Sequence, residues 1–201
     1  MRAVLRFVAS VMMVSGVLLL GDAAATLAWQ EPISYLLAQR QQHRLEASLD
    51  HPPPRVLDRM PLPGDAIGRI EMPTIDRGAY VVEGTDAGDL RKGPGHYSDT
   101  PLPGRHGTVG IAGHRTTHGA PFRHIDDLKR GDPVVLEMPW GSFRYRVRTT
   151  RIVDPTDVGV KRDVGHDRLI LSACHPLYSA AQRIVVFARF VGREAPAVRR
   201  D

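Results

Sequence analysis

One residue stands out chemically among the 201 of this chain, the single cysteine Cys174. It follows the apolar run 169–173 and precedes the polar segment 177–182, so we expect it at the end of a strand that enters a loop. A thiolate is a strong nucleophile, and a lone thiol forms no intramolecular disulfide. The alternative, a buried cysteine that acts as a small apolar side chain, stays open at this point.

A cysteine nucleophile needs an imidazole partner, which accepts the thiol proton and returns it to a leaving amine. The chain has 9 histidines. His114 is favoured because it ends the strand-like run 108–112 and follows Gly110 and Gly113, glycines that permit close approach of the backbone. Two strands of one barrel that both end in polar residues can direct them into one cleft. A thiol–imidazole pair predicts a bell-shaped pH dependence of kcat/KM.

Arg183 is the third candidate, nine residues after Cys174 at the start of the predicted strand 184–191. If 169–173 and 184–191 form a hairpin, Arg183 and Cys174 flank the same end of the sheet beneath an eight-residue connection. A guanidinium stabilises the oxyanion that develops during acyl transfer. The three residues together therefore predict an acyl-transfer site.

A metal site is a weaker alternative. It would use His114, His118, His124 and Cys174, but the segment GHRTTHG is rich in glycine and does not predict a helix. The His-x3-His spacing then does not align two ligands on one face. We predict neither a metal nor a cofactor.

The charge pattern argues against nucleic acid as a partner. The formal net charge is +5, but the 27 cations are scattered among 22 acids, with no basic stripe interleaved with aromatic residues. A hydrophobic content of 42% is sufficient for one globular domain with its own core.

The part of the chain after Gly64 predicts strands, because short runs rich in Val, Ile, Tyr and Phe alternate with Gly, Pro and Asp. The expected strands are 67–71, 80–83, 108–112, 134–138, 142–153, 169–173 and 184–191, with brief helical turns at 87–92 and 122–128. Within 142–153, Phe143, Tyr145 and Val147 alternate with arginines, which indicates a strand with one buried and one solvent-exposed face. The pattern predicts an all-β fold, as a closed or nearly closed antiparallel barrel or a sandwich.

The N-terminus predicts a membrane-targeting segment. Arg2 and Arg6 precede fourteen uncharged residues, 7–20, which places the N-terminus inside. We favour an uncleaved anchor with Trp29 at the outer interface. A signal peptide cleaved near 23–25 stays open, because Asp22 interrupts the longer span. Either interpretation places the remainder outside the cytoplasmic membrane, and the favoured one predicts a single-pass protein of the cell membrane.

Four regions follow from these patterns. We divide the chain into a membrane segment 1–29, a juxtamembrane helix and Pro-rich linker 30–64, a catalytic β-barrel domain 65–192 and a C-terminal tail 193–201. The helix is expected because Ile33, Leu36, Leu37, Leu45 and Leu49 recur at roughly helical spacing. Three prolines at 52–54 end that pattern, so 50–64 predicts a stiff, extended linker.

The three candidate site elements, in this order, resemble the signature of the sortases, which are membrane-anchored cysteine transpeptidases. The resemblance rests on Gly113-His114-Arg115, on the strand that ends in Cys174 and on Arg183, and it covers about 65–192 together with the anchor and linker. The stretches 113–117 and 174–180 are most similar to class E sortases. The resemblance implies an eight-stranded sortase β-barrel with short helices, behind an N-terminal transmembrane helix.

The resemblance also implies roles. Cys174 would attack the Thr-Gly carbonyl of a C-terminal Leu-Ala-x-Thr-Gly or Leu-Pro-x-Thr-Gly sorting signal on a surface protein. His114 would act as general acid and then base, and Arg183 would hold the substrate backbone and the oxyanion. Ser172, Ala173 and His175 are candidate substrate-binding residues, with the His175 amide as a second oxyanion donor. The acceptor amine would come from a peptidoglycan precursor or, in pilus-building relatives, from a pilin lysine.

The sequence departs from the family at two places. Ile170-Leu171-Ser172-Ala173 stands where the family has Thr-Leu-x-Thr, so position 173 offers no hydroxyl. His118 stands close to where class E relatives often carry a tyrosine.

Two other classes of protein stay open. A cysteine L,D-transpeptidase would carry Gly and Arg where Ala173 and Pro176 stand. A non-enzymatic surface-binding β-domain would need no thiol.

Overall fold

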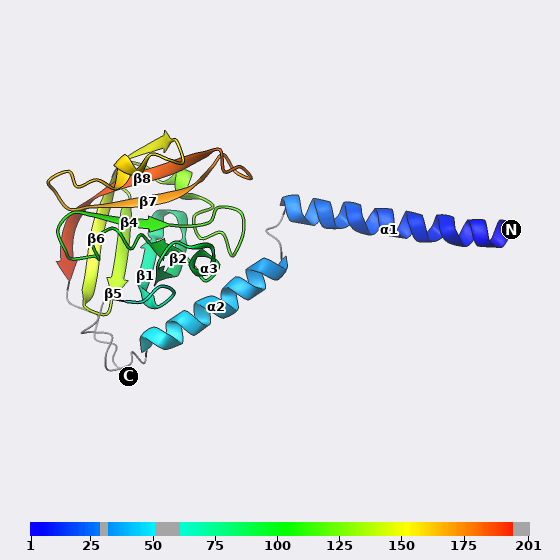
Figure 1. The fold of residues 1–201 in the computed structure, drawn as a ribbon, viewed down its shortest axis with the longest axis horizontal. Helices are drawn as coiled ribbons and strands as arrows, with labels where there is room; N and C mark the ends of the chain where they lie inside the picture. Colours follow the sequence, from blue (N-terminus) through cyan, green and yellow to red (C-terminus); the bar gives the residue numbers. More distant parts are fainter. Residues whose placement is uncertain (29–31, 51–60, 195–201) are drawn as a thin grey trace.

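The computed structural model describes residues 1–28, 32–50 and 61–194. Two helices, α1 (Arg2–Ala28) and α2 (Pro32–Asp50), precede a β-barrel, and α1 projects away from it (Figure 1). Over Arg2–Ala24, α1 is long and apolar enough to cross a membrane, and none of this span is buried against the protein. Trp29, most of the predicted linker (51–60) and most of the tail (195–201) lie outside the described residues.

Eight strands close into a barrel in the order β1-β2-β3-β4-β7-β8-β6-β5. The strands are β1 (Ala66–Met72), β2 (Arg77–Glu83), β3 (Gly95–His96), β4 (Thr108–Ala112), β5 (Pro133–Met138), β6 (Gly141–Val153), β7 (Arg168–His175) and β8 (Gln182–Glu194). The predicted eight-stranded all-β barrel is confirmed, and the sandwich alternative is wrong. Closure pairs β1 with β5, so neither is left as an open edge.

The expectation of a purely antiparallel sheet is wrong, because β2 pairs with β3 and β4 pairs with β7 in parallel. Long connections make this possible, since parallel neighbours cannot be joined by a tight turn. The strand β3 was missed because Gly95–His96 is two residues long and has no alternating pattern.

The core fills the inside of the barrel. On β6, Phe143, Tyr145 and Val147 are buried, while the arginines between them are exposed. This confirms the predicted alternation. The side chain of Phe143 is fully excluded from solvent, which stabilises the fold by about 1.5–3 kcal/mol relative to an exposed ring.

The short helices lie in the connections between strands. The predicted turns at 87–92 and 122–128 appear as α3 (Ala87–Leu90) and the 3₁₀ turn η2 (Ile125–Asp127), each shorter than expected. Two further 3₁₀ turns, η1 (Pro73–Ile75) and η3 (Val158–Lys161), were not predicted from the sequence.

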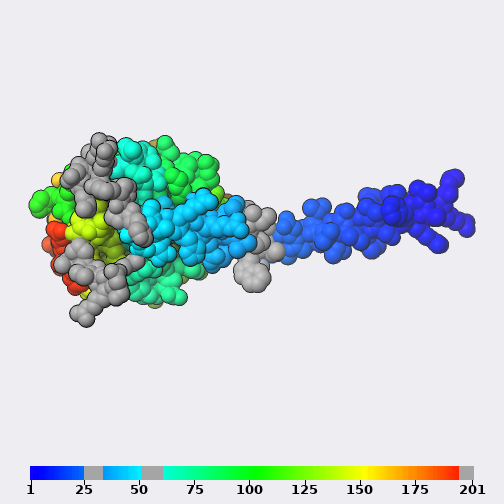
Figure 2. Space-filling view, turned by 90° about the horizontal axis from the view of Figure 1, so that it is seen from below, coloured from blue at the N-terminus to red at the C-terminus, as the bar shows by residue number. Residues whose placement is uncertain are grey.

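The helix α2 lies along the outside of the barrel (Figure 2). Among its described side chains, Ala38 and Leu45 are buried, whereas Leu36 and Leu37 are exposed. Gln42 anchors the helix: its Oε1 accepts from the backbone N–H of Tyr80 at 2.6 Å, and its Nε2 donates to the carbonyls of Tyr80 and Lys92. α2 is therefore part of the folded domain.

Candidate active site

Cys174 and Arg183 face each other across the β7–β8 pair. They are register partners in this antiparallel ladder, so their side chains project from the same face of the sheet. Cys174 is a free, partly exposed cysteine. The strand β7 continues through His175, so Cys174 lies just inside the strand end, and the connection to β8 shortens from eight residues to six, 176–181.

His114 lies just beyond the end of β4, which is the parallel neighbour of β7. Ala112 pairs with Ser172, and the N–H of Gly113 donates to the carbonyl of Ser172 at 3.0 Å. His114 comes two residues after Ala112, as Cys174 comes two residues after Ser172. The paired register itself ends at Ala112 and Ser172, so His114 and Cys174 both follow the last pair of the β4–β7 ladder by two residues.

Gly113 is required where β4 turns into the following loop. A Cβ at this position would lie 2.6 Å from the ring of Phe122, which is fully buried. The N–H of Phe122 in turn donates to the carbonyl of His114 at 3.0 Å. The loop thus folds back on its own first residues and holds the backbone of His114 against the core.

Arg115 is a structural residue of the site to which the sequence analysis assigned no role. Its side chain is buried, forms an ion pair with Asp126 at 2.6 Å and donates through Nη2 to the carbonyl of Arg123 at 3.2 Å. Its Nη1 lies 3.4 Å from Nδ1 of His175. Arg115 therefore joins the loop after His114 to the residue after Cys174. In the sequence, the position of Arg115 directly after His114 was the one local indication that it belongs to the site.

A second contact joins the same two loops. Arg123 donates from Nη2 to the hydroxyl of Tyr178 at 3.3 Å, and its guanidinium carbon lies 6.0 Å from the Tyr178 ring centroid. Tyr178 belongs to the connection that follows Cys174. The segments that carry the nucleophile candidate and the imidazole candidate are thus held together at two points.

The protonation of His114 is shifted by its surroundings. Burial, and in second place the charge of His118, lower the pKa of His114 below the ordinary value of 6.5. The two rings stack, with centroids 4.8 Å apart and planes 28° from parallel. His114 is therefore neutral at pH 7.5 to a greater degree than an ordinary histidine, and a neutral imidazole is the form that accepts a proton.

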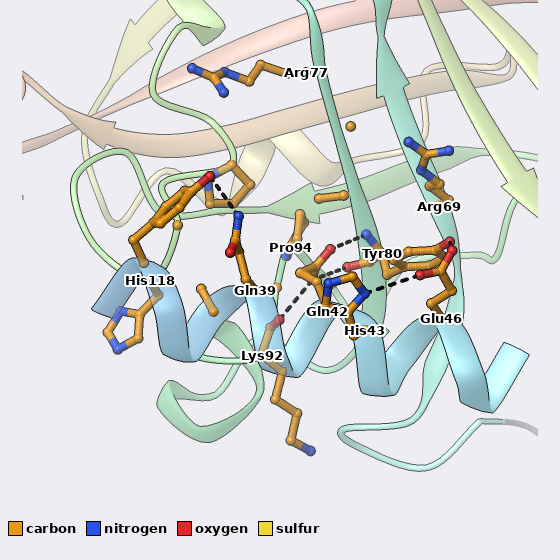
Figure 3. Close-up of a pocket in the computed structure, with 17 residues that line it drawn as sticks. Gln39, Gln42, His43, Glu46, Arg69, Arg77, Tyr80, Lys92, Pro94 and His118 are labelled. Atoms are coloured by element: carbon orange, nitrogen blue, oxygen red, sulfur yellow. Dashed lines mark hydrogen bonds and ion pairs between the residues drawn. The ribbon is translucent and has the colours of Figure 1, made fainter. Parts of the chain in front are cut away.

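His118 lies at one end of a groove between α2 and the barrel, which has a volume of about 320 Å³. Figure 3 shows His118 near one end of α2, with Gln42 and Glu46 directed toward Tyr80 further along the helix. A Cβ at Gly119 would lie 3.1 Å from the Cβ of Ala38 in α2. The helix therefore packs directly against the loop that carries His118.

Replacing His118 with glutamine is expected to raise the pKa of His114, because this change removes one of the two causes that favour the neutral imidazole and leaves burial in place. Titration of the imidazole side chains by NMR measures the shift. His124→Gln is a matched control, since His124 is paired with Asp127 instead. An unchanged titration of His114 in His118→Gln would contradict an electrostatic link between the rings.

The guanidinium of Arg183 is partly engaged. Its Nη1 donates to the carbonyls of Ala180 at 2.9 Å and Gln182 at 3.0 Å, which holds the connection after Cys174. Within the described part of the chain, Nη2 and Nε of Arg183 make no hydrogen bond. A carbonyl or an oxyanion beside Cys174 is a suitable acceptor for these groups.

The side chains of Ser172 and Ala173 are buried. Ala173 belongs to the core inside the barrel, whereas the Ser172 hydroxyl shares a hydrogen bond with the Tyr97 hydroxyl at 3.0 Å. Their assignment to substrate binding, like that of His175, stays a prediction. Tyr97 was not singled out from the sequence, because no local pattern links it to a residue 75 positions away.

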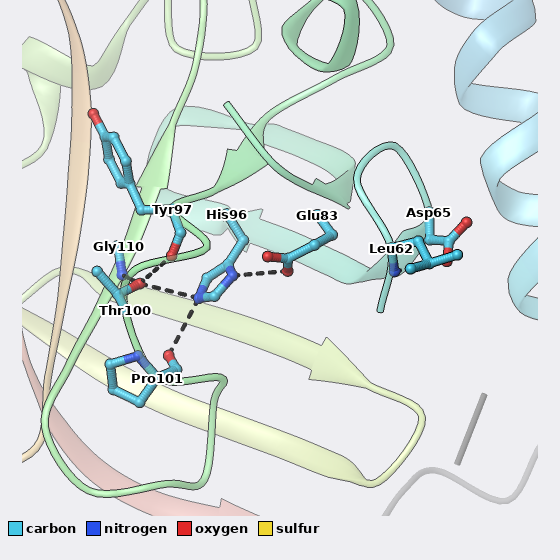
Figure 4. A network of polar contacts seen from close by, with 8 residues as sticks. All are labelled: Leu62, Asp65, Glu83, His96, Tyr97, Thr100, Pro101 and Gly110. Carbon is cyan, nitrogen blue, oxygen red and sulfur yellow. Dashed lines mark hydrogen bonds and ion pairs between the residues drawn. The ribbon is translucent and has the colours of Figure 1, made fainter. Parts of the chain in front are cut away.

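A buried polar network supports the segment that carries Tyr97 (Figure 4). His96 contacts Glu83 at 2.9 Å and Thr100 at 3.1 Å, and the side chains of His96 and Glu83 are nearly excluded from solvent. The hydroxyl of Thr100 accepts from the N–H of Gly110 in β4 and donates to the carbonyl of Tyr97. The network therefore ties β2 and β3 to the strand that leads to His114.

Within 1–28, 32–50 and 61–194, no three His, Cys, Asp or Glu side chains are grouped so that they could hold a metal ion. His114, His118, His124 and Cys174 thus do not form such a group.

Comparisons with known proteins agree on one family. The family described as "Sortase domain" matches residues 70–191. Sortase D of Bacillus subtilis is 37% identical over 136 residues, which are 65% of this chain and 67% of the relative. Sortase SrtE1 of Streptomyces coelicolor is 32% identical over 145 residues, which are 64% of this chain but only 41% of the relative.

A solved structure shows the same relationship in three dimensions. The structure of sortase E from Streptomyces avermitilis matches with a TM-score of 0.63 at 30% identity, over 70% of this chain and 97% of that chain. The E-named relatives confirm the similarity to class E, and the D-named relative shows that the similarity is not limited to that class.

Proposed function

Because the chain belongs to the sortase family of cysteine transpeptidases, we propose that it cleaves a sorting signal between Thr and Gly and transfers the protein to an amine. The proposed signal is Leu-Ala-x-Thr-Gly or Leu-Pro-x-Thr-Gly at the C-terminus of a surface protein. The proposed acceptor is the amine of a peptidoglycan precursor. The observation that carries this proposal is the cross-strand pair of Cys174 and Arg183, with His114 two residues beyond the end of β4, the parallel neighbour of β7.

In the first half-reaction, the Cys174 thiol transfers its proton to His114 as Sγ attacks the carbonyl carbon of the signal threonine. A tetrahedral intermediate forms, and its oxygen carries the negative charge. When the C–N bond breaks, the imidazolium of His114 protonates the departing glycine amine. The protein remains attached to Cys174 as a thioester.

In the second half-reaction, the acceptor amine attacks the thioester carbonyl and its proton passes to His114. The C–S bond then breaks, Sγ leaves as the thiolate, and the proton on His114 restores the thiol. The lowered pKa of His114 suits both proton acceptances, because the ring is mostly neutral when each attack begins. Arg183 stabilises both tetrahedral oxyanions through its free N–H groups.

The membrane location is part of the proposal. α1 serves as an uncleaved, single-pass anchor, with Arg2 and Arg6 on the cytoplasmic side and the barrel outside the cell. We retain the division into 1–29, 30–64, 65–192 and 193–201 as a proposal. One refinement is that Gly64 donates to the carbonyl of Glu83 at 2.7 Å, so the last residues before 65 already contact the barrel.

Intact-mass spectrometry tests this function. The folded protein is incubated with Leu-Ala-x-Thr-Gly and Leu-Pro-x-Thr-Gly peptides, and with a peptide in which Thr and Gly are exchanged. A thioacyl adduct on Cys174 with at least one signal peptide, released by an added amine, is the expected result. The exchanged peptide should give no adduct. The absence of both adduct and cleavage with the two signal peptides would refute the proposal.

Replacing Arg183 with lysine is expected to lower kcat/KM by about 10²–10³, because an ammonium retains the charge but not the planar fork that meets an oxyanion. Steady-state cleavage of the preferred peptide measures this effect. Arg130→Lys is a matched control on an exposed residue outside the site. If Arg183→Lys cleaves at the wild-type rate, Arg183 only supports the loop through Ala180 and Gln182.

A further inference from the structure

Three arginines meet at one level on the outer face of the barrel. Arg189 of β8 is the register partner of Arg146 in β6 and of Arg168 in β7. Residues directly opposite in antiparallel strands share a face, and like charges in such positions destabilise a sheet. Arg146 donates to the carbonyl of Gly131 at 2.8 Å, whereas a bound anion would offset the repulsion between Arg168 and Arg189.

The charged row borders a hollow of about 350 Å³. We call this the cationic hollow, formed around Phe187 by Arg148, Arg151, His166, Arg168 and Arg189. None of the described residues that line it carries a carboxylate. The side chains that line the hollow therefore carry only positive charge, and the electrostatic potentials of the neighbouring guanidinium groups add.

Within the described ranges, the arginines of the cationic hollow have no ion-pair partner. Among the described residues, none of the four lies within 4.0 Å of an acidic side chain, whereas Arg144 on the same strand β6 pairs with Glu194 at 2.9 Å. Asp163 acts on Arg168 only at longer range, and burial together with Arg151 and Arg162 lowers the pKa of Arg168. A bound anion would relieve this uncompensated charge.

Two of these guanidinium groups are held in place. The guanidinium carbons of Arg168 and Arg151 lie 5.2 and 5.6 Å from the ring centroid of Phe187, which is itself buried. Arg168 also donates to the hydroxyl of Thr108 and to two carbonyls of the η3 region. Nη1 of Arg168 and the guanidinium of Arg151 make no hydrogen bond to the described residues, so their N–H groups are available to the oxygens of a phosphate, and their ordering before binding reduces the entropic cost.

We propose that the cationic hollow binds the phosphate groups of a phosphodiester polymer of the cell envelope. A row of cations across several strands suits a chain of phosphates better than one small ion. The inference rests on the proposed extracytoplasmic location of the barrel, but not on the proposed catalytic roles. The Cys174–Arg183 pair lies six register positions along β7 and β8 from the Arg168–Arg189 pair, which is about 20 Å at 3.3 Å per residue. The polymer would therefore bind on the same two strands, about 20 Å from the reaction site.

The position of the hollow favours a soluble polymer over a membrane lipid. α2, which follows the proposed anchor, packs on β1 and β2, and β8 is four strands away from β2 around the barrel. Figure 1 shows α2 and the β7–β8 pair on opposite sides of the molecule. The cationic hollow therefore lies on the side away from the segment that leads to the membrane.

Binding of labelled poly(glycerol phosphate) to the full chain in phosphatidylcholine nanodiscs tests the proposal, with fluorescence anisotropy as the readout. The double variant Arg148→Ser/Arg189→Ser is expected to bind at least about tenfold more weakly than the wild type, with a less steep salt dependence. The matched control, Arg91→Ser/Arg130→Ser, removes the same charge from two exposed residues that do not line the hollow, and it should bind like the wild type. Cleavage of the sorting peptide should not change in either variant.

Three outcomes would overturn the proposal. The first is that the wild type does not bind the polymer at low salt. The second is that both double variants lose the same affinity. The third is that phosphatidylglycerol in the nanodiscs displaces the polymer from the wild type, which would identify a lipid-headgroup site. The variant is expected to remain folded, because its two side chains make no hydrogen bond to described residues. Its Tm should equal or exceed that of the wild type, since like charges are removed.

Discussion

Replacing Cys174 with alanine is expected to lower peptide cleavage by a factor of at least about 10⁴ and to remove the thioacyl adduct completely. The chain contains no second cysteine, so no other thiol can take over the attack. Cleavage and intact mass are measured on the same sample. Cys174→Ser provides a graded comparison, because it retains a hydroxyl nucleophile of similar shape but far lower reactivity.

The alanine variant should still bind the signal peptide, which separates loss of chemistry from loss of fold. Cys174 is partly exposed, and the strand that carries it is held by β4 and β8 on both sides, so removal of one sulfur leaves the ladder intact. Unchanged Tm and peptide affinity are the expected controls. Persistent turnover by Cys174→Ala would show that the nucleophile is a different group.

Replacing His114 with glutamine is expected to lower kcat/KM by about 10²–10⁴, because an amide fills the site but transfers no proton. The bell-shaped pH profile of the wild type should lose the limb that His114 contributes. That limb is expected below the position of an ordinary histidine, since burial and His118 both favour the neutral ring. His106→Gln, an exposed histidine paired with Asp167, is the control.

The pH profile also distinguishes this role from a structural one. If His114 only positioned the loop, His114→Gln would lower the rate evenly across the pH range and keep both limbs. A rate of the wild type that is constant from pH 6 to 9 would exclude the Cys174–His114 pair as acid and base.

Much of the fold follows from local pattern. The bounds of the seven strands with a clear apolar run were predicted within a few residues. Alternating residues on β6 reflect one buried and one exposed face, and the continuous apolar runs on β4 and β7 reflect burial of both faces. The two-residue strand β3 and the parallel pairing of β4 with β7 were not predicted. Strand partners are chosen by closure of the whole barrel, and local sequence does not encode that choice.

For the candidate site, the sequence by itself determined which residues have the chemistry: one thiol, an imidazole after a glycine and a guanidinium nine positions beyond the thiol. Tertiary structure alone decided their relation. The parallel pairing of β4 with β7 brings the segment before His114 beside the strand of Cys174, and the β7–β8 register pairs Cys174 with Arg183. The contact of Tyr97 with Ser172 and the cationic hollow were not predicted, because the residues that form them are distant in the chain. A side chain's type is a local property, whereas its neighbours are set by how the strands close around a common core.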